Sequence, residues 1–139
     1  FQTSEVYRAW GGDSLQLAID TMNDAPEGVF EFNQNDVEFI AWLGPKGPQV
    51  AKTYSSQKDM GQVLTDVKVD IKHENGHTKY FLAIPWSQME QLKPQKGRIF
   101  GLNFIINQNN GQGRRYWLGL TEGIGETKYP FIYRKFKLE

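Results

Sequence analysis

A tryptophan, two glycines and an alternating pattern stand together near the start of the chain, at residues 10–20. The glycines let the backbone turn sharply, which places Trp10 in a turn beside a predicted strand. Gln16 and Asp20 fall on the polar face of that strand. An aromatic ring beside amide and carboxylate groups suits a sugar, because the sugar's C–H face packs on the ring while its hydroxyls donate and accept hydrogen bonds. The alternative is that Trp10 covers an edge of the core.

Other polar residues do not form a recognisable catalytic site. A glycosidase needs two carboxyl groups facing each other across a cleft, whereas the acidic residues are scattered, at Asp13, Asp20, Glu38, Glu122 and Glu126. The chain has no GxSxG, HExxH or P-loop motif. It also has no cysteine, and therefore no thiol nucleophile. We predict that the chain is not an enzyme and requires no cofactor.

Two carboxylates in the turn after the first strand are candidate metal ligands. The sequence of residues 20–24, Asp-Thr-Met-Asn-Asp, offers the oxygen ligands that Ca²⁺ prefers. Asp20 and Asp24 are therefore predicted ligands of a structural Ca²⁺, with an ordinary polar turn as the alternative.

The composition limits the partners. Lys plus Arg and Asp plus Glu both number 16, so the formal net charge is zero, and no basic run is present. This argues against nucleic acid. No apolar run reaches the ~18 residues of a transmembrane helix, so we expect no membrane partner. No signal peptide is present, and a secretion signal would lie outside these residues. The 139 residues fit one domain, 1–139.

Short strand patterns at even spacing predict an all-β fold, an antiparallel β-sandwich of jelly-roll or immunoglobulin-like type. Residues 1–8 are expected to be extended. Asn75-Gly76 predicts a hairpin, because both turn positions need positive φ. A short helical turn is expected near residues 87–92, where Ser87 can cap it. The nine predicted strands cover residues 13–20, 28–33, 37–43, 49–54, 67–72, 78–84, 98–107, 114–120 and 131–138.

Alternation along these strands also predicts which residues lie inside the sandwich. Lys68, Asp70 and Lys72 should face outward on their strand. The predicted interior residues are Leu15, Leu17, Ile19, Val67, Val69, Ile71, Leu82, Ile84, Leu102, Phe104 and Ile106.

Several motifs taken together resemble the family 9 carbohydrate-binding modules. They are residues 10–20, residues 80–87 (Tyr-Phe-Leu-Ala-Ile-Pro-Trp-Ser), residues 100–107 (Phe-Gly-Leu-Asn-Phe-Ile-Ile-Asn), Arg115 and residues 128–131 (Lys-Tyr-Pro-Phe). The order and spacing of these pieces are specific together. The resemblance implies a non-catalytic carbohydrate-binding module of a larger secreted, glycan-active protein. Its partners would be a poly- or oligosaccharide and the rest of a multidomain parent.

The resemblance also implies where a sugar would bind. Such modules hold a terminal sugar between two tryptophans, and Trp10 matches the first. The second is expected near residues 120–122, where this chain has Thr121 and the nearest tryptophan is Trp117. Gln16 stands where those modules place a glutamate. We predict a slot between the Trp10 turn and residues 114–121, with these candidate binding residues: Trp10, Gln16, Arg115, Trp117 and Thr121.

The chain also departs from these modules. They have several strands before the tryptophan turn, whereas this sequence starts almost at it. We therefore expect that strands from outside these residues, or from a partner chain, complete the sheet beside residues 1–20. The alternative function is a structural or interaction domain of an extracellular assembly that has lost the sugar slot. Haem binding is a further alternative, but His73 and His77 flank one hairpin and the methionines fall in predicted turns or the short helix.

Overall fold

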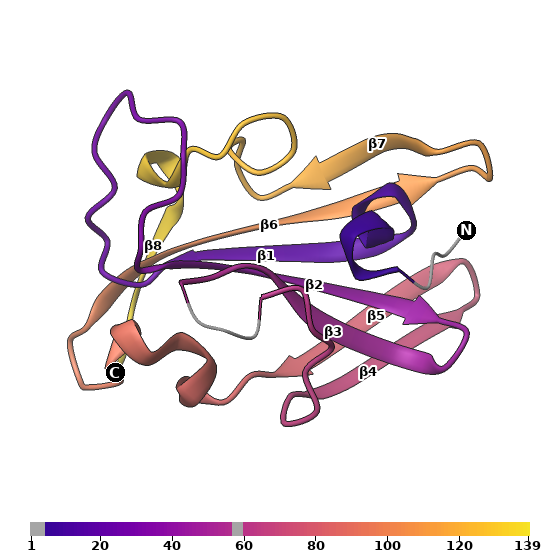
Figure 1. Ribbon diagram of the computed structural model, residues 1–139, viewed down its shortest axis with the longest axis horizontal. Coiled ribbons are helices and arrows are strands. Elements are labelled where there is room, and N and C mark those ends of the chain that lie inside the picture. Colours follow the sequence, from indigo (N-terminus) through magenta and orange to yellow (C-terminus); the bar gives the residue numbers. More distant parts are fainter. Residues whose placement is uncertain (1–4, 57–59) are drawn as a thin grey trace.

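The computed structural model describes residues 5–56 and 60–139 and shows an antiparallel β-sandwich, as predicted (Figure 1). The larger layer is a six-stranded sheet in which β1 lies at the centre, between β2 and β6. The long strand β6 pairs on its other side with β8 through its first residues and with β7 through its last ones. The strands of this sheet are β1 (Ser14–Asp20), β2 (Asp36–Gly44), β3 (Gly47–Tyr54), β6 (Ile99–Asn109), β7 (Arg114–Gly119) and β8 (Arg134–Lys137).

The smaller layer is a single hairpin of β4 (Lys68–Glu74) and β5 (His77–Ala83). Asn75 and Gly76 have φ values of 52° and 76° at its turn, as the sequence predicted. Ile71 faces the large sheet and is buried, whereas Lys68, Asp70 and Lys72 are exposed. The predicted register of this hairpin is therefore confirmed.

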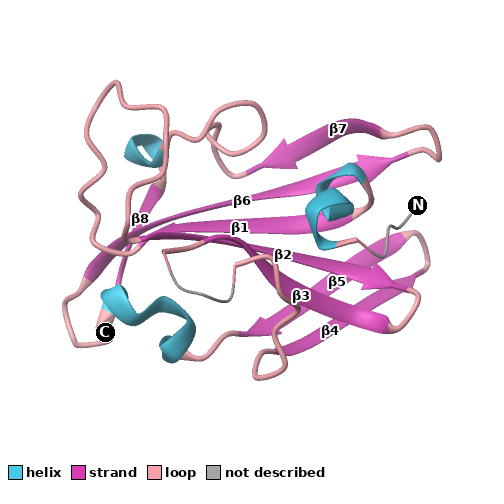
Figure 2. Ribbon diagram, viewed as in Figure 1, coloured by secondary structure: helices cyan, strands magenta, loops and turns pink. Residues whose placement is uncertain are grey.

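Three short 3₁₀ helices complete the described fold (Figure 2): η1 (Val6–Gly11), η2 (Trp86–Leu92) and η3 (Pro130–Ile132). Helix η2 is the helical turn expected near residues 87–92. The extended conformation expected for residues 1–8 holds for Glu5 but is wrong for residues 6–8, which belong to η1 and pack through Val6 on the sheet. Residues 1–4 lie outside the described part of the chain.

Two predicted strands differ from the structure. Residues 28–33 form no strand, because Gly28 turns the chain with a φ of 78°. Phe30 and Phe32 instead pack singly against Tyr129 and Tyr54. The last strand is shorter than predicted, because Pro130 begins η3 and β8 covers only Arg134–Lys137. Eight strands are present in the described residues.

The two faces of the large sheet are covered differently. The face toward β4 and β5 is apolar, and Phe39, Val50 and Leu92 are fully buried there. The opposite face, here called the outer face, is covered at one end by η1 and at the other by the segment after β7. Trp42 lies under η1 and is completely buried, so both faces of β2 are covered.

The predicted interior is confirmed in part. Ile19, Val67 and Ile71 are buried. Ile106 is 37% exposed, because none of the described residues forms a second layer over this part of the sheet. The other predicted interior residues are only half-buried: Leu15, Leu17, Val69, Leu82, Ile84, Leu102 and Phe104.

The expectation of extra strands beside residues 1–20 is wrong for β1. This strand forms hydrogen bonds with β2 on one side and with β6 on the other, so it has no free edge. Over residues 5–56 and 60–139, no helix combines the length and hydropathy needed to cross a membrane.

Candidate functional site

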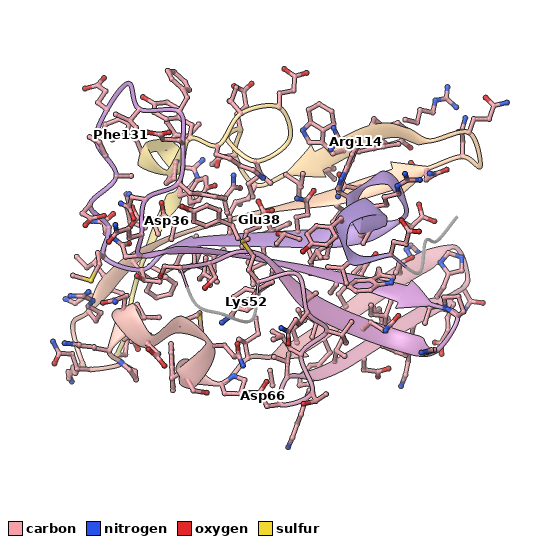
Figure 3. All side chains as sticks on the ribbon, viewed as in Figure 1. Asp36, Glu38, Lys52, Asp66, Arg114 and Phe131 are labelled. Carbon is pink, nitrogen blue, oxygen red and sulfur yellow. The ribbon has the colours of Figure 1, made fainter. Side chains whose placement is uncertain are left out.

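A pocket of about 360 Å³ lies on the outer face of the large sheet, between η1 and the segment that follows β7. Strands β1, β2, β3 and β7 of the large sheet each contribute a side chain to its lining. Figure 3 shows Glu38 near the middle of this face and Arg114 near β7 and η1. The residues that line the pocket are Tyr7, Trp10, Gln16, Glu38, Thr53, Arg114, Ile124, Gly125, Glu126 and Lys128.

The floor is a diagonal row of hydrogen-bonded polar side chains, one from each of five adjacent strands. Thr53 donates to the Glu38 Oε1 atom over 2.6 Å, and Gln16 Nε2 donates to the same oxygen over 3.2 Å. Asn107 Nδ2 then donates to Gln16 Oε1 over 2.9 Å, and Arg114 donates to Asn107 Oδ1 over 3.3 Å. Because each amide both donates and accepts, the row fixes the orientation of Gln16 and Asn107.

Glu38 is the charged centre of this row. Glu38 is only 3% exposed. Its Oε1 atom accepts from Thr53 and Gln16, and Lys128 Nζ lies 2.5 Å from its Oε2 atom. A buried carboxylate is stable when it is paired and hydrogen-bonded, which Gln16, Thr53 and Lys128 achieve together. The floor of the pocket therefore offers both hydrogen-bond donors and acceptors.

Two tryptophan rings and one guanidinium group lie at the other end of the row. The Arg114 guanidinium carbon is 5.0 Å from the centre of the Trp10 ring and 4.6 Å from that of Trp117, both within the range of cation–π contacts. The Trp117 indole packs directly on Gly125, where an added Cβ atom would come within 2.5 Å of the ring. Trp10 is 46% exposed and Trp117 37% exposed.

The outer-face asparagines of β6 hold the two walls of the pocket in place. Asn103 Nδ2 donates to the carbonyl oxygens of Thr121 and Glu122, over 3.1 and 2.8 Å. At the opposite end of β6, the side chain of Asn109 donates to the Gly11 carbonyl at the end of η1. Tyr133 adds a buried hydroxyl that donates to the Gly123 carbonyl over 2.9 Å, and burial raises the pKa of this phenol well above its usual range.

The structure brings together some of the predicted site residues and separates others. Trp10 and Gln16 line the pocket, and Trp117 touches Arg114 and Gly125 at its edge. Arg115 is exposed at the bulge where β7 changes register against β6, and its neighbour Arg114 lines the pocket. Thr121 is bonded through its backbone to Asn103, so it positions the wall.

Sequence reasoning missed Glu38, Thr53, Arg114 and Lys128. Glu38 could have been found from the sequence. Alternation places it on the opposite face of its strand from Val37 and Phe39, and residues 49–54 were expected to pair with this strand across the turn at residues 44–48. Lys128 stood in the motif at residues 128–131. The bulge in β7 decides between Arg114 and Arg115, and a bulge is not visible from alternation.

An aromatic groove continues from the pocket past Lys128. This second hollow, about 370 Å³, shares Glu38, Thr53 and Lys128 with the pocket. Its other walls include Phe30, Phe32 and Tyr54. The Phe32 and Tyr54 rings lie 4.7 Å apart, and Phe30 is 59% exposed.

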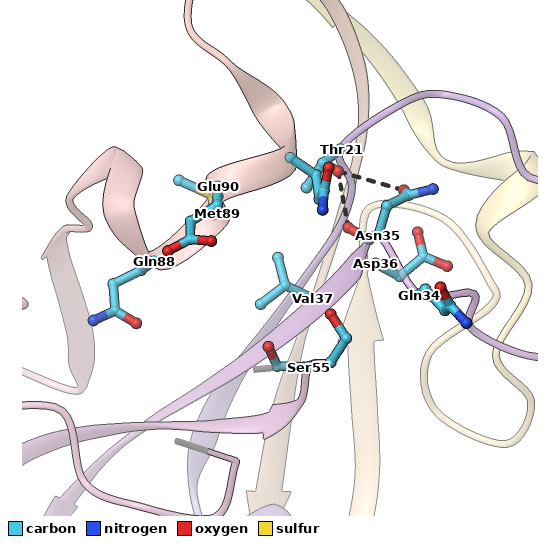
Figure 4. Close-up of a pocket in the computed structure, with 11 residues that line it drawn as sticks. Thr21, Gln34, Asn35, Asp36, Val37, Ser55, Gln88, Met89 and Glu90 are labelled. Carbon is cyan, nitrogen blue, oxygen red and sulfur yellow. Dashed lines mark hydrogen bonds between the residues drawn. The ribbon is translucent and has the colours of Figure 1, made fainter. Parts of the chain in front are cut away.

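A third, much smaller hollow lies where β2 begins, beside η2 (Figure 4). Its volume of about 50 Å³ fits a few water molecules and is too small for a sugar ring. Asp36, one of its lining residues, is 2% exposed and has one buried carboxylate oxygen without a hydrogen-bond partner. Burial, opposed by the Asn33 N–H and aided by the charges of Asp20 and Asp24, raises the pKa of Asp36 to about 7.

The predicted calcium ligands stand close to this carboxyl group but are already hydrogen-bonded. Asp20 accepts the N–H groups of Asp24 and Ala25, and Asp24 accepts the side-chain amides of Asn33 and Asn35. Within residues 5–56 and 60–139, no group of three or more Asp, Glu, His or Cys side chains is arranged to hold a metal. Structural Ca²⁺ at Asp20 and Asp24 therefore stays a prediction.

The fold is shared with solved carbohydrate-binding modules of family 9. One such module, from Caldicellulosiruptor kristjanssonii in complex with cellotriose, superposes with a TM-score of 0.67 at 16% identity and covers 94% of this chain. The complex of a family 9 module from the same organism with glucose superposes equally well, at 15% identity. The chain spans only 59% and 60% of the two solved chains. The expected family 9 type of β-sandwich is therefore confirmed.

Other comparisons add little. No protein-family model matches the chain. The membrane protein insertase YidC of Nitrosococcus oceani is 24% identical over 108 residues, which cover 76% of this chain and 19% of that protein. The chain thus spans about a fifth of that relative. The two solved neighbours are themselves carbohydrate-binding modules.

Proposed function

We propose that this chain is a non-catalytic carbohydrate-binding domain that holds a terminal sugar ring in the pocket between η1 and the segment after β7. The observation that carries the proposal is the meeting of Trp10 and Trp117 at one end of a buried hydrogen-bonding floor. An apolar sugar face needs an aromatic ring, and its hydroxyls need fixed donors and acceptors. This pocket offers both within one fold that sugar-binding modules also use.

In this arrangement the sugar would stack on Trp10 at the open side of the pocket. Arg114 and Lys128 would donate to its hydroxyls, and Gln16 and Glu38 would accept from them. Because Glu38, Gln16 and Asn107 are already held by one another, little side-chain entropy is lost on binding. Water competes for the sugar hydroxyls, so we expect dissociation constants of roughly micromolar to millimolar. These correspond to binding free energies on the order of −8 to −4 kcal/mol.

Isothermal calorimetry with glucose, cellotriose and a wider panel of oligosaccharides tests the proposal. Heat that fits a single site with one of these sugars would support it. No heat with any sugar at millimolar protein concentration would contradict it. That outcome would favour the alternative, an interaction domain without a sugar slot. This alternative is supported by the Arg114 guanidinium, which already lies on both tryptophan rings.

We further propose that the domain serves a larger secreted, glycan-active protein. Support comes from the motifs at residues 10–20, 80–87 and 100–107, which resemble those of family 9 modules. The coding sequence around residues 1 and 139 tests this part. A flanking glycan-active domain and a secretion signal are expected, and a cytoplasmic protein without either would contradict it.

A further inference from the structure

Arg114 brings a positive charge to the pocket that no described residue neutralises. Its guanidinium group lies against the rings of Trp10 and Trp117, and Nη1 donates to the neutral amide oxygen of Asn107 over 3.3 Å. Within residues 5–56 and 60–139, no carboxylate forms an ion pair with it. A guanidinium group carries five N–H donors, so most of the donor capacity of Arg114 is unused by the described chain.

The other charged groups that line the pocket are either paired or exposed. Lys128 is the second cation, and it is paired with Glu38, whose carboxylate also accepts from Thr53 and Gln16. Glu126 is exposed, so solvent screens its charge. Arg114 is therefore the group in the pocket with which a negatively charged ligand would pair.

The contacts of Arg114 with the two tryptophan rings and with Asn107 restrict the orientation of its guanidinium group. This group is planar, with N–H donors along its edge and faces that pack on aromatic rings. A carboxylate has the matching shape, because its two oxygen atoms accept a pair of parallel N–H bonds. Since the guanidinium group is already held, pairing with a carboxylate would cost little further side-chain entropy.

We propose that the sugar recognised by the pocket carries a carboxylate, as a terminal uronic acid does, and that Arg114 binds this carboxylate. The inference rests on the proposed carbohydrate function and names the class of sugar. In a uronic acid the carboxylate is attached at the edge of the ring, so the ring can contact Trp10 while the carboxylate meets the guanidinium group beside the same indole. Charge-assisted hydrogen bonds are roughly twice as strong as neutral ones. A uronic acid should therefore bind more tightly than the neutral sugar with the same ring.

Calorimetric titration of the chain with glucuronic acid and with glucose, at neutral pH and low salt, tests this inference. The two sugars share one pyranose ring and differ only at the exocyclic carbon. We expect about tenfold tighter binding of glucuronic acid, and this ratio should shrink at high salt because ions screen the charge pair. Equal affinity for the two sugars would overturn the inference and leave the proposed carbohydrate function intact. No heat with either sugar or with any neutral oligosaccharide would overturn both.

Two variants assign the charge effect to one residue. Arg114→Gln removes the charge and keeps a hydrogen-bonding side chain, so the affinity ratio of the two sugars should fall close to one. Arg115→Gln is the matched control and should keep the ratio, because Arg115 is exposed and does not line the pocket. An unchanged ratio in Arg114→Gln, or the same fall in Arg115→Gln, would overturn the inference.

A short aspartate peptide, titrated in the same way, separates a sugar acid from an acidic protein partner. Weaker binding of the peptide than of glucuronic acid would support the inference. Tighter binding of the peptide would assign Arg114 to an acidic protein partner and would overturn the inference. If Arg114→Gln does not fold, the affinity ratio of the parent chain and its salt dependence decide the question without a variant.

Discussion

The guanidinium group of Arg114 stacks on Trp10, with its central carbon 5.0 Å from the centre of the ring. The same group lies 4.6 Å from the Trp117 ring and donates to Asn107 on the floor of the pocket. The Arg114 guanidinium therefore connects the two tryptophan rings with the buried row of amide side chains. A sugar that stacks on Trp10 displaces this guanidinium or shares the ring with it, so the contacts of Arg114 and Trp117 should control binding.

Gly125→Ala should weaken sugar binding while changing stability little. The added methyl group would come within 2.5 Å of the Trp117 indole, so the ring must move away from Arg114. We expect about a tenfold higher dissociation constant, which corresponds to about 1.4 kcal/mol. Gly11→Ala is the control, because its Cβ atom meets nothing within 4 Å. Equal affinity of both variants in calorimetry would contradict the role of Trp117.

Loss of Lys128 should destabilise the fold through Glu38. Lys128→Met removes the cation that pairs with the Glu38 carboxylate. Glu38 is only 3% exposed, and Gln16 and Thr53 would be its remaining hydrogen-bond donors. We expect a loss of about 2 kcal/mol, less than for a fully buried pair because Lys128 is one-third exposed. In the Lys128→Met, Glu38→Gln double variant the loss should be smaller than the sum of the single losses.

The surface pair of Arg8 and Glu5 provides the comparison for that cycle. Its side chains are 80% and 68% exposed, so a cycle through Arg8→Ala and Glu5→Ala should show almost no coupling. Urea unfolding at neutral pH measures both cycles. Additive losses at Lys128 and Glu38 would show that the pair is not coupled.

Asp36 should make the fold less stable as the pH rises. Its pKa is about 7 in the folded state, against 3.8 for an unperturbed aspartate, so the folded state holds the proton more tightly. Stability from this group is complete below pH 3.8 and is lost as the pH rises through 7. The shift corresponds to about 4 kcal/mol between the two protonation states.

Asp36→Asn tests this pH dependence. The variant should be more stable than the parent at pH 8 and should lose the part of the decline between pH 4 and 7 that Asp36 causes. Urea unfolding across this range measures the difference curve. The same curves with millimolar Ca²⁺ and with chelator test the calcium prediction, because a bound cation would remove the penalty at pH 8. Identical pH profiles of variant and parent would refute the raised pKa.

The strand positions and the hairpin register followed from alternation, because one face of each strand must be buried. Three features did not follow. Residues 28–33 look like a strand but are turned by Gly28, and their aromatic rings pack one at a time. The bulge in β7 brings Arg114 and not Arg115 to the pocket. The floor joins side chains from five strands, and their order in the sheet is set by tertiary packing.

The aromatic groove should bind a second sugar unit. Phe30→Ala removes an exposed ring at its far end, and should weaken cellotriose binding about fivefold, or by about 1 kcal/mol, while leaving glucose binding unchanged. Phe81→Ala is the control, because the Phe81 ring lies on β5 and is 60% exposed, nearly the same as Phe30 at 59%. If glucose and cellotriose bind equally tightly to the parent, the groove has no part in binding.

Stacking on Trp10 should dominate the affinity. Trp10→Ala should raise the dissociation constant about thirtyfold, or by about 2 kcal/mol, since both stacking and buried area are lost. Trp86→Ala is a matched control, because both residues are 46% exposed and Trp86 lies in η2, outside the pocket. A comparable loss in both variants would show that the effect is not local to the pocket.

The most direct measurement is a titration of the four indole N–H signals of the ¹⁵N-labelled chain with glucose and cellotriose. Trp10 and Trp117 lie at the pocket, Trp42 is buried under η1 and Trp86 lies in η2. The proposed site predicts saturable shifts of the Trp10 and Trp117 signals and none of the Trp42 and Trp86 signals. Shifts confined to Trp86, or four signals unmoved at saturating sugar, would contradict a carbohydrate site at this pocket.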